Sequence, residues 1–249
     1  MSKKVQSIFI LPNNDKLTTC KTCEMTYNQS INNEVKIHNK YHLKFTNGLN
    51  WPHSLIDKTL DTITIVDKKV KSTNHKSIIS KEMKLAKVIS IDKMNKNQVL
   101  KTESLLRMCN LELNATPDSK QWQKFQYQSS KAFILVIDKK AIGICTTDEI
   151  KPIDSRWMIY KTQQIVTDKE IKNVKIGISR IWIAPKWRGF GLAKKLLEIV
   201  LKYSIYGVVL NKNQIAFSQP SYSGCQLAKS FNGVLHKSGE VLIPVYLEG

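Results

Sequence analysis

The sequence predicts a mixed α/β domain preceded by a small metal-bound ββα module. Three observations carry this prediction: a Cys and His cluster near the start, apolar hairpins after residue 98, and a strand–loop–helix unit over 173–206. Early antiparallel hairpins followed by alternating strands and helices favour one mixed sheet. The predicted order is a flexible tail over 1–17, the module over 18–46, a partly ordered linker over 47–97 and the α/β domain over 98–249.

The composition bounds the class of protein. The chain has 249 residues, of which 42% are hydrophobic, and this is compatible with a packed core. No apolar run reaches the roughly 20 residues that span a bilayer, and no secretory signal is found at the N-terminus. An odd count of five cysteines argues against a disulfide framework. A soluble intracellular protein is therefore expected.

The net charge is +19, with a pI near 9.7. Such a positive potential favours encounter with polyanions, so nucleic acid, chromatin and acidic protein surfaces are candidate partners. A lysine-rich genome would give the same composition, and charge alone does not establish DNA binding.

The cluster near the start has the spacing of metal ligands. Cys20 and Cys23 form a Cys-x2-Cys pair, and 14 residues later His38 and His42 form a His-x3-His pair. Histidines four apart share one helix face, and the two thiols of a Cys-x2-Cys turn can bind one ion. Four protein ligands leave zinc no open position, so the predicted site is structural.

Further residues fit a C2H2-type zinc finger. Tyr27 and Val35 occupy the two apolar core positions of such a finger, and the loop is two residues longer than the commonest form. One finger reads about three base pairs, too few for useful specificity. We expect it to place the protein on a partner or to brace the linker.

The α/β domain is predicted from alternating apolar segments. Val99 to Cys109 indicates a helix, and the last strand is expected over 241–247. Between them we expect hairpins over 132–145 and 157–166, a strand over 214–217 and a helix over 223–230.

The unit over 173–206 is typical of a pyrophosphate-binding device. An apolar strand over 176–183 precedes a basic loop with Arg188, Gly189 and Gly191, and a helix follows from Leu192. Glycines let a ligand approach the backbone, and the free N–H groups of a helix start attract anions. An ordinary strand-to-helix turn is the alternative; a dinucleotide fold is weaker because a third glycine is absent at the right spacing.

The spacing Arg188-x-x-Gly191-x-Ala193 resembles the acetyl-CoA loop of the GNAT acetyltransferases. This resemblance implies a GNAT fold. It also implies cofactor contacts from Ile181, Trp182, Ile183, Arg188, Gly189, Phe190, Gly191, Leu192 and Ala193.

The segments over 175–182, 215–220 and 243–246, together with the finger, resemble the cohesin acetyltransferases of the short budding-yeast type. The resemblance implies a nuclear enzyme that uses acetyl-CoA to acetylate lysines on the ATPase head of the cohesin SMC subunit, establishing sister-chromatid cohesion during S phase.

The same resemblance implies three site residues. Glu198 matches an acidic position on the helix after the loop, and Ser179 and Ser218 match positions that line the substrate side. Gln219 stands where animal members carry an Asp and cannot act as a base. A lysine ammonium must lose a proton before it attacks, so Glu198 is the predicted proton acceptor. The plainer interpretation of Glu198 is a solvated acid on a helix face.

Near the N-terminus, Gln6 to Phe9 could form a reduced sliding-clamp-binding motif, a feature that the resemblance implies. Two other functions stay open: a zinc-finger protein that binds nucleic acid or chromatin through a non-catalytic α/β domain, and a GNAT that acts on another protein.

Overall fold

The computed structural model describes the backbone of residues 17–73, 76–115 and 130–247. It describes the side chains of these residues except those of 67–81. The predicted tail, including the motif over 6–9, lies outside these residues. None of the helices in the described ranges is both long and apolar enough to cross a membrane.

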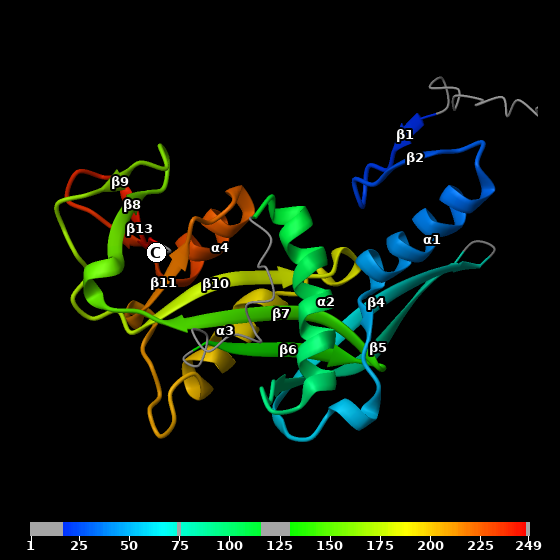
Figure 1. The fold of residues 1–249 in the computed structure, drawn as a ribbon, viewed down its shortest axis with the longest axis horizontal. Helices are drawn as coiled ribbons and strands as arrows, with labels where there is room; N and C mark the ends of the chain where they lie inside the picture. The colour runs from blue at the N-terminus through cyan, green and yellow to red at the C-terminus, as the bar shows by residue number, and fades with distance from the viewer. Residues whose placement is uncertain (1–16, 74–75, 116–129, 248–249) are drawn as a thin grey trace, which may run out of the picture.

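The N-terminal module is a ββα unit (Figure 1). Strands β1 (Leu17–Thr19) and β2 (Thr26–Asn28) pair antiparallel, and α1 (Asn32–Asn47) follows them. The Glu34 carboxylate at the helix start accepts a hydrogen bond from the Asn28 N–H at 2.6 Å, which joins the helix to the hairpin. The predicted zinc-finger fold is confirmed.

The main sheet is mixed, as predicted. Its strand order is β4-β5-β6-β7-β10-β11-β13-β8-β9, with β3 on β7 and β12 on β13. The pairs β10–β11 and β11–β13 are parallel, and the other pairs are antiparallel. The strands are β3 (Leu49–Asn50), β4 (Thr59–Thr73), β5 (Lys76–Ser90), β6 (Lys131–Ile137), β7 (Lys140–Glu149), β8 (Ser155–Ile159), β9 (Ile165–Val166), β10 (Ile176–Ile183), β11 (Ile215–Ser218), β12 (Val234–Leu235) and β13 (Val241–Tyr246).

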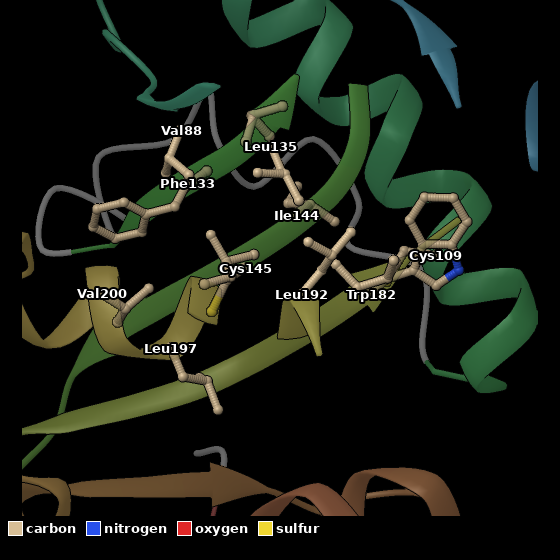
Figure 2. Close-up of a cluster of buried hydrophobic side chains, with 14 of the residues drawn as sticks. Val88, Cys109, Phe133, Leu135, Ile144, Cys145, Trp182, Leu192, Leu197 and Val200 are labelled. Carbon is tan, nitrogen blue, oxygen red and sulfur yellow. The ribbon is translucent and has the colours of Figure 1, made fainter. Parts of the chain in front are cut away.

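Three helices accompany this sheet: α2 (Lys96–Leu113), α3 (Leu192–Tyr203) and α4 (Tyr222–Asn232). In Figure 1, α2 crosses in front of β6 and β7, and α3 lies behind them. The apolar stripe of α3, with Leu196, Leu197 and Val200, is buried. Figure 2 shows Leu197 and Val200 beside Phe133 and Cys145 of the central strands, within one buried cluster.

The segment over 47–97 is not the linker that its composition suggested. β5 pairs with β6 through Lys87 to Ser90, so β4 and β5 extend the main sheet. Ile63 and Ile65 are buried two residues apart, opposite Ala86 and Lys84 in register. A strand with one buried face needs apolar residues only at alternate positions, so Lys and Thr between them conceal the pattern. The α/β domain therefore begins before residue 98.

The finger and the domain share one core. Phe45 of α1 is buried and its ring lies 6.1 Å from the ring of Trp182 on β10. Trp51, which follows α1, is fully buried, and its backbone N–H donates to the Lys139 carbonyl at 2.7 Å. The finger is therefore packed against the strand that precedes the glycine loop.

Candidate functional site

The main sheet opens where β10 and β11 part. The two strands pair only over Ile176–Ile178 and Ile215–Phe217, whereas β10 continues to Ile183. A pocket of about 690 Å³ is lined by the residues that follow the last pair, by the glycine loop and by the start of α4. This volume lies within the usual range of small-molecule sites.

The glycine loop forms one end of the pocket. Gly189 and Gly191 have φ angles of +83° and +71°, and a Cβ at either position would meet no atom within 4 Å. Gly191 is the N-cap of α3 and provides no side-chain cap. The first N–H groups of a helix have no partner within it, so this end presents free donors and the positive end of a helix dipole. The open cradle fits the pyrophosphate of acetyl-CoA.

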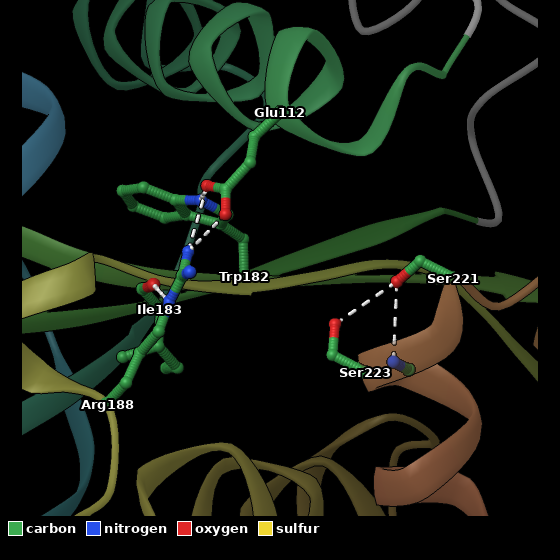
Figure 3. A network of polar contacts seen from close by, with 7 residues as sticks. Glu112, Trp182, Ile183, Arg188, Ser221 and Ser223 are labelled. Carbon is green, nitrogen blue, oxygen red and sulfur yellow. Dashed lines mark hydrogen bonds and ion pairs between the residues drawn. The ribbon is translucent and has the colours of Figure 1, made fainter. Parts of the chain in front are cut away.

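A charged cluster lies on the loop side of the pocket, across from Ser221 and Ser223 (Figure 3). The Glu112 carboxylate, from the end of α2, accepts bonds from Arg188 Nη2 at 2.7 and 2.8 Å and from Trp182 Nε1. Arg188 Nε donates to the Ile183 carbonyl at 2.8 Å. The arginine predicted to meet the pyrophosphate thus lines the pocket, but its charge is shared with Glu112.

Most of the predicted cofactor residues meet in this pocket. Phe190 does not line it and packs against the core instead. The eight that line it are Ile181, Trp182, Ile183, Arg188, Gly189, Gly191, Leu192 and Ala193.

Ser179 and Ser218 line the pocket from the two parted strands. The register of β10 against β7 shifts between Ile178 and Arg180. Ser179 is therefore a bulge residue, which strand pairing leaves without a ladder partner. Its hydroxyl lies 2.8 Å from Thr146 Oγ1.

The structure does not bring Glu198 to the pocket. Glu198 is exposed on α3 and is absent from the lining residues, whereas its neighbours Leu197 and Ile199 are buried. Its role as a proton acceptor stays a prediction, to be weighed against carboxylates that lie nearer the parted strands.

The four predicted metal ligands form one cluster. One ligand atom from each of Cys20, Cys23, His38 and His42 lies within 4.8 Å of all the others, and Cys20 Sγ is 3.3 Å from His42 Nδ1. Both ring nitrogens of the buried His38 lack a hydrogen-bond partner. Its ring stacks on Tyr27 at 4.0 Å, which holds it toward the cysteines.

The donor set fits zinc. Two thiolates and two imidazoles are the ligands of closed tetrahedral zinc sites, and a metal would satisfy the orphaned His38 nitrogen. Hydrogen bonds from the backbone of Cys23 and Thr22 lower the pKa of Cys20 to about 5, whereas burial raises the pKa of Cys23. The remaining cysteines, at 109, 145 and 225, are free thiols buried in the core.

Sequence reasoning missed two parts of the site. Glu112 comes from a helix 70 residues before Trp182, and no local pattern marks it. Ser221 and Ser223 line the pocket at the start of α4 (Figure 3), where the Ser221 hydroxyl accepts from the Gly224 N–H at 3.3 Å. Ser221 is a residue type typical of N-caps and could have identified this helix start.

Comparisons with known proteins agree with this geometry. The family model described as ESCO1/2 acetyl-transferase matches residues 172–239, which hold the glycine loop, and the model described as zinc-finger of acetyl-transferase ESCO matches residues 6–44. The xEco2 acetyltransferase domain bound to a K105-CoA conjugate superposes with a TM-score of 0.50 at 21% identity, covering 66% of this chain and 92% of that one. This likeness shows the fold.

Whole-chain relatives are more similar. The N-acetyltransferase ECO1 of Debaryomyces hansenii is 48% identical over 258 residues, covering 99% of this chain and 90% of the relative. The N-acetyltransferase ECO1 of Saccharomyces cerevisiae is 32% identical, covering 94% of this chain and 90% of the relative. With this similarity over nearly the whole length, and with the finger and the glycine loop both in place, the chain belongs to the ECO1 family of N-acetyltransferases.

Proposed function

We propose that this acetyltransferase moves the acetyl group of acetyl-CoA to lysines on the ATPase head of a cohesin SMC subunit. The observation that carries the proposal is the pocket between β10 and β11, with free backbone donors at one end and polar side chains on the parted strands. The names of the relatives support acetyl transfer.

Acetyl-CoA supplies an activated acetyl group in this proposal. The N–H groups at Gly189, Gly191, Leu192 and Ala193 hold its pyrophosphate, and the residues of β10 from Ile181 to Ile183 line the path toward the parted strands. Arg188 adds positive charge at the loop while it remains paired to Glu112.

Acetylation of the substrate lysine requires two contributions from the chain: removal of a proton and stabilisation of a developing charge. Its ammonium, with a pKa near 10.4, must lose a proton before the nitrogen can attack. The negative charge that develops on the acetyl oxygen needs a donor, and in this proposal the N–H of the bulge residue Ser179 provides it. Ser179 and Ser218 flank this point, and Glu198 remains the acceptor that the sequence predicts.

The finger holds zinc through Cys20, Cys23, His38 and His42 in this proposal. Four protein ligands saturate the ion, so its contribution is to stability and position. Because Phe45 packs on Trp182, the finger also supports one wall of the pocket.

A nuclear location and a sliding-clamp contact through 6–9 complete the proposal, because the family resemblance implies an enzyme that establishes sister-chromatid cohesion during S phase. The clamp contact rests on the sequence alone.

The decisive experiment is acetylation of a purified cohesin head. The full-length chain, acetyl-CoA and the head are incubated, and mass spectrometry locates acetyl-lysines. We expect acetylation of a few head lysines that requires both the chain and acetyl-CoA. A head that stays unmodified while acetyl-CoA is bound would contradict the substrate assignment.

A second function, contact with DNA, is supported by one face of α1. Lys36, Lys40 and Lys44 follow one another at four-residue intervals and are all exposed. Such a stripe can neutralise phosphates, and each lost contact should reduce the slope of log affinity against log salt by about 1. Electrophoretic shift of DNA at several salt concentrations, with the triple Lys→Gln variant, tests it.

A further inference from the structure

A second pocket lies between the finger and the α/β domain. It has a volume of about 420 Å³, and its walls are the finger turn over 23–25, Tyr41 and Phe45 of α1, and Leu111 and Glu112 at the end of α2. This volume lies within the usual range of ligand sites. We refer to it as the seam pocket, and the acetyl-transfer steps above give it no role.

The walls of the seam pocket favour an apolar occupant over a basic one. Met25 and Leu111 line it beside two aromatic rings, and a methionine side chain adapts its shape to an apolar partner. The Glu112 carboxylate is bound to Arg188, so its charge is already compensated. Glu24 is exposed and stays in contact with water when the pocket is filled.

The edge of the seam pocket is itself apolar. Leu111 lines the pocket although 65% of this side chain is exposed. Phe45, deeper in the seam, is only 3% exposed. An apolar segment that enters the pocket would therefore remove apolar surface from water at its opening as well as inside.

The chain carries such a segment just ahead of the finger. Residues 8–11 are Ile, Phe, Ile and Leu, the longest apolar run within 1–16. These residues lie outside the part of the chain that the structure describes, which begins with β1 of the finger. The run overlaps the predicted clamp motif over 6–9 at two positions.

The segment is long enough to reach the seam pocket. The Cys20 N–H donates to the Met25 carbonyl at 3.0 Å, so the turn over 23–25 stands at the end of the β1–β2 hairpin. From Leu17 to Cys20 the strand covers about 10 Å. Leu11 precedes Leu17 by six positions, and six extended residues span about 20 Å. The segment can therefore fold back along the hairpin.

The short tether favours binding within the same chain. A flexible connection of this length gives an effective concentration on the order of millimolar, so a weak affinity for the pocket is sufficient. The family model of the finger matches residues 6–44 and thus begins well before β1. The segment over 6–16 is therefore part of the sequence unit that this finger model describes.

We propose that the seam pocket binds the apolar segment over 8–11 of the same chain. Phe9 enters between the finger turn and the end of α2, where Met25 and Leu111 contact it. Since Ile8 and Phe9 also belong to the clamp motif, the segment cannot occupy the pocket and a sliding clamp together. This second consequence rests on the clamp contact of the proposed function, whereas the docking itself does not.

The test combines a photo-crosslink with one pair of matched variants. In the full-length chain, Phe9→p-benzoylphenylalanine places a photoreactive ring at the centre of the segment, and mass spectrometry locates its crosslinks. Leu111→Glu puts a charge at the edge of the seam pocket. Leu100→Glu makes the same change at a leucine of α2 that is 54% exposed but does not line the pocket. Zinc content and Tm show whether each variant is folded.

We expect crosslinks within one chain to the peptides that hold Met25 or Leu111. Leu111→Glu should lower their yield at least about fivefold, because docking would then cover an unpaired charge, and Leu100→Glu should leave the yield unchanged. In chains that keep the natural Phe9, Leu111→Glu should bind purified sliding clamp about threefold more tightly than the wild type, because more of the tail is then free to bind.

Several results would overturn the proposal. Crosslinks that join two chains would assign the pocket to a second copy, and crosslinks confined to other surfaces would leave the segment without this site. Equal yields from Leu111→Glu and Leu100→Glu would also reject it. A raised KM for the cohesin head in Leu111→Glu, with unchanged crosslinks, would assign the pocket to the protein substrate. If no variant binds the clamp, the proposed clamp contact is wrong, and the crosslinks still decide the docking.

Discussion

The metal cluster and the acetyl-transfer pocket are built in opposite ways. The four metal ligands lie within 23 consecutive positions, 20–42, and their spacing alone places them on one turn and one helix face. The pocket is lined by residues from Glu112 to Ser230, drawn from two strands, three helices and the loops between them. Local spacing suffices for the first site, whereas the second exists only once the sheet has formed.

This difference explains what the sequence could predict. The residues predicted to contact the cofactor are close together in the sequence, at 181–183 and 188–193, so a short motif reveals them. All of them except Phe190 line the pocket. The bulge at Ser179 depends on how β10 meets β7, and the position of Glu112 depends on where α2 ends. Neither is encoded in nearby residues.

The proton acceptor on the amine side is the least predictable part. Glu198 matches the family pattern on the helix that follows the loop, but the structure leaves it exposed on α3 and outside the pocket lining. Its neighbours Leu197 and Ile199 are buried, so the helix directs Glu198 to solvent.

The largest expected effect tests whether the glycine loop is the binding site for the pyrophosphate of acetyl-CoA. Gly191→Asp should weaken acetyl-CoA binding at least about 100-fold, because a carboxylate would stand against the pyrophosphate in the open cradle; 100-fold corresponds to about 2.7 kcal/mol. Calorimetry measures the affinity. Gly207→Asp is the matched control, since Gly207 has a φ of +72° and equally open space but lies outside the pocket lining. Equal affinities for the two variants would reject the loop as the pyrophosphate site.

The next effect tests how separate the two sites are. Cys23→Ala should abolish stoichiometric zinc, measured by elemental analysis, and lower the Tm, because so short a module lacks a core of its own. Transfer to a free lysine peptide should survive within about tenfold, with acetyl-CoA affinity reduced severalfold through the Phe45–Trp182 contact. Cys225→Ala, a buried cysteine outside the cluster, should keep its zinc. Unchanged zinc content in Cys23→Ala would refute the ligand set.

A smaller effect tests the long-range contact in the cofactor half of the pocket. Glu112→Gln keeps the shape of the side chain but stops neutralising Arg188. We expect acetyl-CoA to bind about threefold tighter at low salt, and the difference to shrink in about 1 M salt, where charges are screened beyond about 3 Å. Weaker binding at every salt concentration would show that Glu112 serves to hold Arg188 in position.

The smallest expected effect concerns Glu198, and it tests whether this acid on the helix after the loop accepts the proton of the substrate lysine. Glu198 is exposed on α3, so Glu198→Gln removes a solvated charge, and kcat on the cohesin head should change by less than about threefold at any pH. The assignment from sequence alone predicts a fall of about 10²–10⁴-fold at neutral pH that lessens as the substrate lysine becomes neutral. Acetyl-CoA affinity is measured alongside as a check that the variant still binds cofactor. A large, pH-dependent loss in Glu198→Gln would establish Glu198 as the proton acceptor, and Gln219→Asp in that background should then restore activity.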